Sequence, residues 1–361
     1  MTCCNSGLRL FRAAPWLGAA LLLGQCQGDP RSSQAPPREA AVTVAESFLT
    51  ERRETYNVDS PAVWHGPGDR HWLLSTAKST HQLLVHDAAD GKLIRRVGGP
   101  GTGAGTFLRP NGVAVIGDFA VVVERDNHRL QALSLPDFEP AAMIGAEVLR
   151  RPYGIAAAPG EGGWDVWVTD NYEPTSASAP AAEMGERLRR FRLQVTEAGL
   201  TGEYAGAFGD TTEAGCLRKV ETVAVDPLHG RMLVAEEAER VLKVYDLEGR
   251  FTGELAGAGL FRYEPEGVAL LECGEGGGYW LATDQDDADN RFLALDRESL
   301  AGRGAFSGAV TANTDGVALT GRGFGPFSRG AFYAVHDDGN VAAFDLAEIV
   351  RALGLDCPPP R

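Results

Sequence analysis

Residues 220–246 read Val-Glu-Thr-Val-Ala-Val-Asp-Pro-Leu-His-Gly-Arg-Met-Leu-Val-Ala-Glu-Glu-Ala-Glu-Arg-Val-Leu-Lys-Val-Tyr-Asp. Three short apolar runs are separated by a Pro/Gly turn and by a cluster of charges, which predicts three antiparallel strands of one small sheet. The opening of this unit recurs as Asn111-Gly-Val-Ala-Val, Tyr153-Gly-Ile-Ala-Ala, Glu266-Gly-Val-Ala-Leu, Asp315-Gly-Val-Ala-Leu and, more loosely, Asp59-Ser-Pro-Ala-Val. Six units of roughly 40–50 residues predict an all-β chain folded as a six-bladed β-propeller.

The propeller is expected to occupy residues 41–356 as one closed ring, because the repeats run through most of the chain. Apolar residues at 42–49 are candidates for a strand that closes the ring and removes the last exposed sheet edge. Residues 171–186 are rich in Pro, Ser and Ala and interrupt the third unit, so they should form a loop on one face. A short helix is expected at 346–355.

The ends of the chain read differently from the repeats. Residues 1–26 resemble an export signal, since two arginines precede an apolar run at 13–23 that is too short to span a bilayer. The run at 23–26, Leu-Gly-Gln-Cys, resembles a bacterial lipoprotein signal, and ordinary cleavage near the same point is the alternative. A flexible tether at 27–40 would follow, and 357–361 would form a tail. The protein is therefore expected to be exported, as a periplasmic protein, a membrane-anchored lipoprotein or a secreted protein.

The chain carries a formal net charge of −15 and has a sequence pI near 5.0. This balance disfavours nucleic acid and anionic membranes as partners, so membrane contact is expected only through an N-terminal lipid anchor. We expect a monomer. Outside the signal, Cys216, Cys273 and Cys357 allow at most one disulfide, and no Cys-x-x-Cys motif occurs.

Two glycine-containing runs bear on function. Residues 98–105 are Gly-rich but lack the spacing of a phosphate-binding loop and precede a strand, so they predict an inter-blade loop. The run at 103–131 resembles an NHL repeat, itself a propeller blade. A non-catalytic NHL-like propeller that binds a protein or glycan partner is therefore one hypothesis for function.

The innermost strands of a propeller line its channel, so residues at one register of the six repeats form a ring. The position before the repeated Gly, or its counterpart where Ser60 or Thr222 replaces the Gly, gives a first ring of Asp59, Asn111, Tyr153, Glu221, Glu266 and Asp315. The second strand is antiparallel to the first, so its end lies at the same channel mouth. This second ring reads Lys78, Arg125, Asn171, Glu237, Gln285 and, with a looser alignment, Asp338. One side of the mouth should be cationic, because blades one and two supply Lys78 and Arg125, and the other side anionic.

Clustered carboxylates at this mouth imply a cation. At an effective dielectric near 20, each close pair of carboxylates is repelled by roughly 4 kcal/mol, so the cluster needs raised pKa values or bound cations. Oxygen donors without His or Cys favour calcium over magnesium or manganese. The alternative for any one of these positions is a solvated acidic residue at the start of a strand.

These residues give the chain a resemblance to the β-propeller phytases, which are six-bladed calcium-dependent enzymes that release phosphate from myo-inositol hexakisphosphate. The resemblance extends over about residues 59–346. Its most specific pieces are Asp59-Ser-Pro-Ala-Val-Trp, Val234-Ala-Glu-Glu and Thr314-Asp-Gly-Val. The spacing of Glu221 and Glu237, like that of Glu266 and Gln285, is similar to the spacing of the family's metal ligands.

The resemblance implies a calcium-dependent phosphatase with a phytate-like small-molecule substrate. It implies that a metal-held water attacks phosphorus directly, without a covalent intermediate. The implied metal ligands are Asp59, Glu221, Glu237, Glu266, Gln285 and Asp315. Implied catalytic residues are Lys78, Arg125 and Glu237, and implied substrate contacts are Lys78, Arg125, Tyr153 and Asn171. Three positions depart from the family pattern, where Asp, Asp and Lys are expected: Ser60, Glu264 and Asn171.

Overall fold

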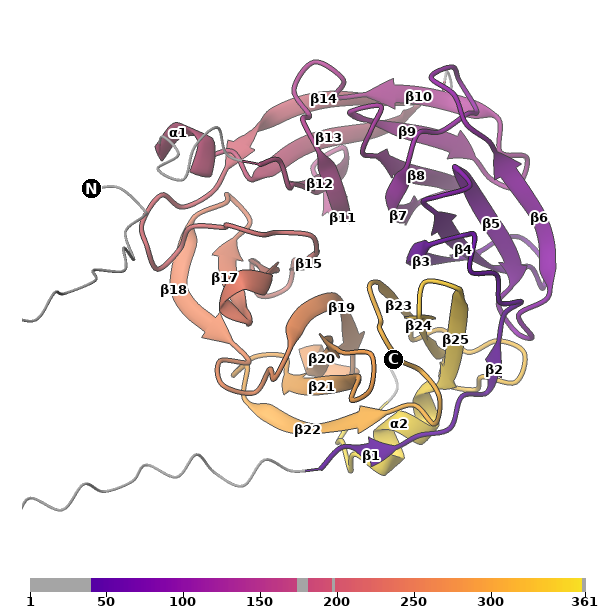
Figure 1. Ribbon diagram of the computed structural model, residues 1–361, viewed down its shortest axis with the longest axis vertical. Coiled ribbons are helices and arrows are strands. Elements are labelled where there is room, and N and C mark those ends of the chain that lie inside the picture. The colour runs from indigo at the N-terminus through magenta and orange to yellow at the C-terminus, as the bar shows by residue number, and fades with distance from the viewer. Residues whose placement is uncertain (1–39, 174–180, 197–198, 359–361) are drawn as a thin grey trace, which may run out of the picture.

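The computed structural model describes residues 40–173, 181–196 and 199–358. Its strands form six sheets of four antiparallel strands around a common axis, and one sheet gains a fifth strand at its edge (Figure 1). The six-bladed β-propeller predicted from the repeats is therefore confirmed. The predicted signal and nearly all of the predicted tether lie outside the described residues.

Each of the first three blades runs from an inner strand at the channel to an outer strand at the rim (Figure 1). Blade one comprises β3 (Val58–His65), β4 (His71–Ala77), β5 (Gln82–Asp87) and β6 (Leu93–Gly98); blade two comprises β7 (Pro110–Ile116), β8 (Phe119–Glu124), β9 (Arg129–Ser134) and β10 (Pro140–Ile144); blade three comprises β11 (Pro152–Gly160), β12 (Gly163–Asp170), β13 (Leu188–Thr196) and β14 (Gly199–Phe208).

The remaining blades repeat this order, except that the last takes its outer strand from the N-terminal part of the chain. Blade four comprises β15 (Val223–Asp226), β16 (Arg231–Glu236), β17 (Val241–Asp246) and β18 (Phe251–Ala256); blade five comprises β19 (Glu264–Glu272), β20 (Gly278–Gln285), β21 (Arg291–Asp296) and β22 (Gly302–Ser307); blade six comprises β23 (Val317–Thr320), β24 (Ala331–His336), β25 (Asn340–Asp345) and β2 (Phe48–Leu49). The helices are α1 (Ala181–Met184) and α2 (Leu346–Ala352), with 3₁₀ turns at Glu237–Glu239 and Gly274–Gly276.

Two short N-terminal strands close the ring. In β2, Phe48 pairs antiparallel with Ala343 of β25, which completes blade six. Before it, β1 (Val42–Thr43) pairs in parallel with β22 at the edge of blade five. The predicted closure by residues 42–49 is confirmed, but two strands on two blades provide it where the sequence predicted one strand. Closure covers sheet edges that would otherwise offer unpaired backbone groups to another chain.

The core lies between the blades rather than within any one of them. Six apolar clusters each join two neighbouring blades, and one of them joins the last blade to the first. At that junction, Val58 and Leu73 of blade one pack with Tyr333 and Val335 of blade six. Middle strands such as β8 are buried along almost their whole length because each sheet has a neighbour on both faces. Burial of apolar surface thus stabilises every junction of the ring.

The repeated glycine of the openings allows neighbouring inner strands to approach closely. A Cβ on Gly154 would lie 2.1 Å from the carbonyl oxygen of Glu221, and one on Gly316 would lie 2.3 Å from that of Asp59. No side chain fits at such a distance, so glycine is required there. Thr169 strengthens one of these contacts, since its Oγ1 accepts a hydrogen bond from Gly154 N (2.8 Å) and donates to Glu221 O (2.7 Å). The ring residues are consequently drawn together around the axis.

The C-terminal part of the chain is fastened to blade five. Helix α2 falls within the helix expected at 346–355. A disulfide joins Cys273 to Cys357, and Cys216 is buried elsewhere. Cys357 is therefore attached to the ring, whereas the sequence placed it in a tail; residues 359–361 of that tail lie outside the described residues.

The predicted insertion in blade three connects β12 with β13 (Figure 1). It contains α1, and its residues 174–180 are not among those described. Across the described ranges of the chain, no helix is both long and apolar enough to cross a membrane.

Candidate metal centre and cationic cavity

The first-ring residues stand where the innermost strands are irregular. In four blades the strand register shifts around the ring position, namely at Asp59, Asn111, Tyr153 and Glu266. In blades four and six, the ring residues Glu221 and Asp315 come just before β15 and β23. A bulge breaks the regular alternation of side chains and re-aims the bulged residue, which is why bulges are frequent beside functional sites.

The second ring lies beside the first, as the antiparallel pairing predicts. In blades one to four, the backbone N–H that follows the second strand donates to the carbonyl oxygen two residues before the first-ring position, over 2.9–3.2 Å. These pairs are Lys78 with Asn57, Arg125 with Arg109, Asn171 with Arg151, and Glu237 with Lys219. In blade five, Gln285 is the strand partner of Glu264. Both rings therefore share one channel mouth.

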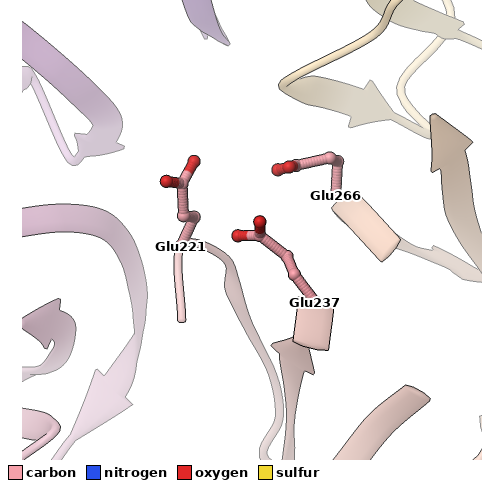
Figure 2. A group of neighbouring side chains, drawn as sticks. All are labelled: Glu221, Glu237 and Glu266. Carbon is pink, nitrogen blue, oxygen red and sulfur yellow. The ribbon is translucent and has the colours of Figure 1, made fainter. Parts of the chain in front are cut away.

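Three predicted ligands converge at this mouth: Glu221, Glu237 and Glu266 (Figure 2). One carboxylate oxygen of each lies within 4.8 Å of those of the other two. Glu237 begins the 3₁₀ turn after β16, and Glu266 lies in the bulge of β19. Both are buried, whereas Glu221 is partly exposed. We call these three residues the glutamate cluster.

Burial raises the pKa of each member of the glutamate cluster. The pKa of Glu221 rises to about 7, with repulsion from Asp59 adding to the effect of burial. That of Glu237 rises to about 8, because burial and then Glu221 disfavour its charged form. Burial and the two other glutamates hold the pKa of Glu266 well above its ordinary value. Without a cation, the cluster thus retains protons near neutral pH, and a bound cation would favour their release.

The other predicted ligands gather around Lys78. Its Nζ lies 2.7 Å from Oδ1 of Asp59 and 2.9 Å from Oδ2 of Asp315. Burial alone would lower the pKa of Lys78, but attraction to these two carboxylates raises it above its ordinary value. Gln285 donates from Nε2 to Oδ1 of Asp315 over 2.6 Å. The six predicted ligands therefore form two groups, the glutamate cluster and a second group around an internal ammonium.

A cavity of about 330 Å³ borders the glutamate cluster on the side of blades two to four. Its cationic lining residues are Arg109, Arg125, Arg151, Arg187, Arg218 and Lys219. Arg187 is buried and structural, since its guanidinium donates to the carbonyl oxygens of Leu217 (2.9 Å) and Asp170 (3.3 Å). Arg125 is more accessible and pairs with Asp126 over 2.7 Å. We call this space the cationic cavity.

The sequence placed both Lys78 and Arg125 on a cationic side of the mouth, and the structure bears this out only for Arg125. Lys78 lies among carboxylates, because the first-ring residue of its own blade is Asp59 and the next blade around the ring supplies Asp315. Positive charge is instead concentrated over blades two to four, where Arg109, Arg151 and others line the cavity.

Tyr153 and Asn171 line the same cavity and connect it to the carboxylates. The hydroxyl of Tyr153 donates to Oδ1 of Asp59 over 3.1 Å, and Nδ2 of Asn171 donates to Oε1 of Glu221 over 3.2 Å. The remaining first-ring residue, Asn111, is fully buried, and within the described chain its side-chain amide has no hydrogen-bond partner. All predicted substrate contacts except Lys78 therefore line the cavity.

Sequence reasoning missed a third ring of residues. The positions two residues before the first ring read Asn57, Arg109, Arg151, Lys219, Glu264 and Asn313. Three consecutive cations in this register supply the charge of the cationic cavity, so the same alignment contained the signal. Asp338, which the second ring contained but the predicted ligands did not, hydrogen-bonds through its side chain with Asp315.

Lys219 contacts the glutamate cluster from the cavity side. Its Nζ pairs with Oε2 of Glu237 and lies 3.3 Å from Oε2 of Glu264. These two carboxylates raise the pKa of Lys219 despite the opposing effect of burial. The lysine side chain is 48% exposed, while that of Glu237 is fully buried.

The donor set of the glutamate cluster fits a calcium ion. Calcium binds oxygen ligands at about 2.3–2.6 Å, so two ligands of one ion lie at most about 5 Å apart. The three glutamate oxygens lie within 4.8 Å of one another and meet this condition. Their burial and raised pKa values are also what a cluster built around a cation shows in its absence.

Comparison with known proteins adds little to this geometry. No protein-family model matches the chain, and no curated protein matches it either. Among solved structures, the chain is similar to Kuenenia stuttgartiensis hydrazine synthase at 12% identity, over 84% of this chain and 80% of that one, with a TM-score of 0.49. It is also similar to a chain of a nidogen/laminin complex at 14% identity, over 74% and 87%, with a TM-score of 0.49. Neither likeness bears on the chemistry of the site.

Proposed function

We propose that the protein is a calcium-dependent phosphomonoesterase that acts on phytate or a related polyphosphorylated small molecule. The observation that carries this proposal is the shared border of the glutamate cluster and the cationic cavity, since Glu221 belongs to both. A donor set for a divalent cation beside an arginine-rich cavity matches what phosphoryl transfer requires, namely metal-assisted attack and neutralisation of phosphate charge.

In this proposal the glutamate cluster holds calcium, and Asp59, Gln285 and Asp315 ligate from the group around Lys78. Bound calcium supplies a water nucleophile of lowered pKa and a positive charge beside the phosphoryl oxygens. Arg125 offers a planar guanidinium that can donate to two phosphate oxygens at once. Lys78 holds the carboxylates of Asp59 and Asp315 in place through its two ion pairs, and in this proposal it also contacts phosphate.

Tyr153 serves as a neutral hydrogen-bond donor. Burial, and then the nearby carboxylates beginning with Asp59, raise its pKa well above the ordinary value, so its proton stays on the hydroxyl. Arg109 and Arg151 also line the cavity, and in this proposal they provide charge for phosphate groups other than the reacting one. A substrate with several phosphates suits this distribution better than a simple monoester does.

The test is phosphate release from phytate by the purified protein, with calcium and with a chelator. Release that requires calcium supports the proposal, with a protein that carries Glu237→Gln as the inactive control. An absence of release in calcium would refute it and would favour the alternative, a non-catalytic NHL-like propeller that binds a protein or glycan partner.

Export through residues 1–26 remains a prediction, which fractionation of producing cells would check.

A further inference from the structure

We propose that Lys219 is a displaceable cation, which pairs with Glu237 in the metal-free protein and turns to the substrate phosphate when a metal ion binds the glutamate cluster. The inference rests on the proposed function and deepens it, because it specifies how metal binding and phosphate binding are coupled.

The position of Lys219 carries the inference. Its ammonium is paired with Glu237, a member of the glutamate cluster, while its side chain lines the cationic cavity. The same nitrogen lies 3.3 Å from Glu264, so two carboxylates hold it at the border of the two sites. No other residue both lines the cavity and forms an ion pair with the glutamate cluster, among the residues that the structure describes.

A metal ion at the glutamate cluster would compete directly with this ammonium. Glu237 would ligate the ion through the carboxylate that now faces Lys219, and the ion would repel the ammonium at short range. Lys219 is able to leave, because its side chain is 48% exposed and lysine has a flexible four-carbon stem.

Lys78 provides an internal comparison. It also pairs with carboxylates at the mouth, but its side chain is only 6% exposed and it is held from both sides by Asp59 and Asp315. That ammonium is therefore almost completely enclosed. Lys219, in contrast, lines the cationic cavity, where an anion would bind.

The experiment measures calcium and inorganic phosphate binding by calorimetry, using the full chain. Phosphate affinity is measured with and without saturating calcium, and their ratio gives the gain that calcium produces. The variants are Lys219→Met, which removes the charge, and Lys219→Arg, which retains it. The control is Lys92→Met, which removes one positive charge from an exposed pair with Asp90. Circular dichroism checks folding, and Lys219→Gln replaces the Met variant if that protein does not fold.

In Lys219→Met, calcium should bind about two- to fivefold more tightly, because a half-exposed lysine that forms an ion pair of modest strength no longer competes. The gain in phosphate affinity should fall at least threefold, and it should be retained in Lys219→Arg and Lys92→Met. A smaller fall in Lys219→Met would overturn the inference, since Lys219 would then be a static ion pair. That result is distinct from failure of the proposed function, in which the unaltered protein would bind no calcium.

Discussion

The hydroxyl of Tyr153 lies 3.1 Å from Oδ1 of Asp59, so a side chain of blade three reaches a carboxylate of blade one within the channel mouth. The same Asp59 oxygen lies 2.7 Å from Nζ of Lys78 and forms an ion pair with it. Tyr153 also lines the cationic cavity, and it therefore connects the proposed substrate cavity to the second group of candidate ligands.

A double-mutant cycle with Tyr153→Phe and Asp59→Asn should reveal this contact. The loss of stability from both changes should be smaller than the sum of the separate losses by about 1 kcal/mol, which is typical of an intramolecular hydrogen bond. Urea denaturation in the presence of chelator provides the measurement. Strict additivity would mean that the two side chains do not interact.

Calcium should raise the melting temperature of the protein. An ion bound only by the native ring stabilises it by about 2.7 kcal/mol at a hundredfold excess over its Kd. The glutamate cluster joins blades four and five, so the ion would tie two sheets together. Calorimetric scans with calcium and with chelator check this, and a melting curve that neither reagent moves would remove the metal-site claim.

Glu221→Gln and Glu237→Gln should each abolish calcium-dependent phosphate release. Each change replaces a carboxylate ligand by a neutral amide but nearly preserves side-chain volume. In chelator the variants should be at least as stable as the unaltered protein, because repulsion within the cluster is reduced. Glu254→Gln, on the exposed face of β18, is the matched control and should retain activity. Full activity in either cluster variant would count against the ligand assignment.

Asn171→Lys should lower KM for phytate with little change in kcat. The new ammonium would lie beside Glu221 at the wall of the cationic cavity, where a charge-assisted contact to an anion contributes of order 1–3 kcal/mol. The gain should shrink as salt is added, since Asn171 is only partly buried. Kinetics at low and high ionic strength provide the measurement, and an unchanged KM at low ionic strength would show that residue 171 does not face substrate.

His86 should make the protein less stable in mild acid. The imidazole is 2% exposed, and burial, with repulsion from Arg96, lowers its pKa from about 6.5 to about 4. Between pH 6.5 and 4 the unfolded chain binds a proton at this position that the native protein does not, so stability falls as the pH falls through this window. The full effect of this difference is about 3 kcal/mol.

The comparison for His86 is a variant with His86→Leu, studied by urea denaturation at several pH values in chelator. Both proteins share the glutamate cluster, so the difference between their pH profiles isolates His86. Parallel profiles from pH 7 to pH 4 would show that His86 is not a source of the acid sensitivity.

Much of the fold was predictable because the repeats encode it. Four of the six openings carry a glycine that is required where inner strands approach, as Gly154 does with Glu221, and the looser matches in blades one and four completed the set. Antiparallel pairing then placed two rings at one mouth, and the hydrogen bond from Lys78 N to Asn57 O shows the expected register. Residues that share a register can be aligned without knowledge of how the sheets pack.

Side-chain partners could not be predicted in the same way. The alignment of the repeats placed Lys78 on the side of the mouth opposite the acidic residues. Whether a lysine faces carboxylates or a cavity, however, depends on the directions of the side chains from neighbouring blades. Lys219 was overlooked because its register was not compared across the repeats. The pairing of Cys273 with Cys357 was equally open, since three cysteines allow several choices and only the fold brings these two together.

The N-terminal strands β1 and β2 and the C-terminal disulfide have a mechanical consequence, because all three attach the chain to blades five and six. Strand β1 holds the edge of blade five through two residue pairs, β2 holds blade six through two more, and the disulfide ties Cys357 to blade five. A pull on the chain ahead of Val42 would peel β1 first and then β2, both of which lie at the rim of the ring. The glutamate cluster and the cationic cavity lie near the axis, at the inner strands of the blades, and would stay off the loaded path until that seam had opened.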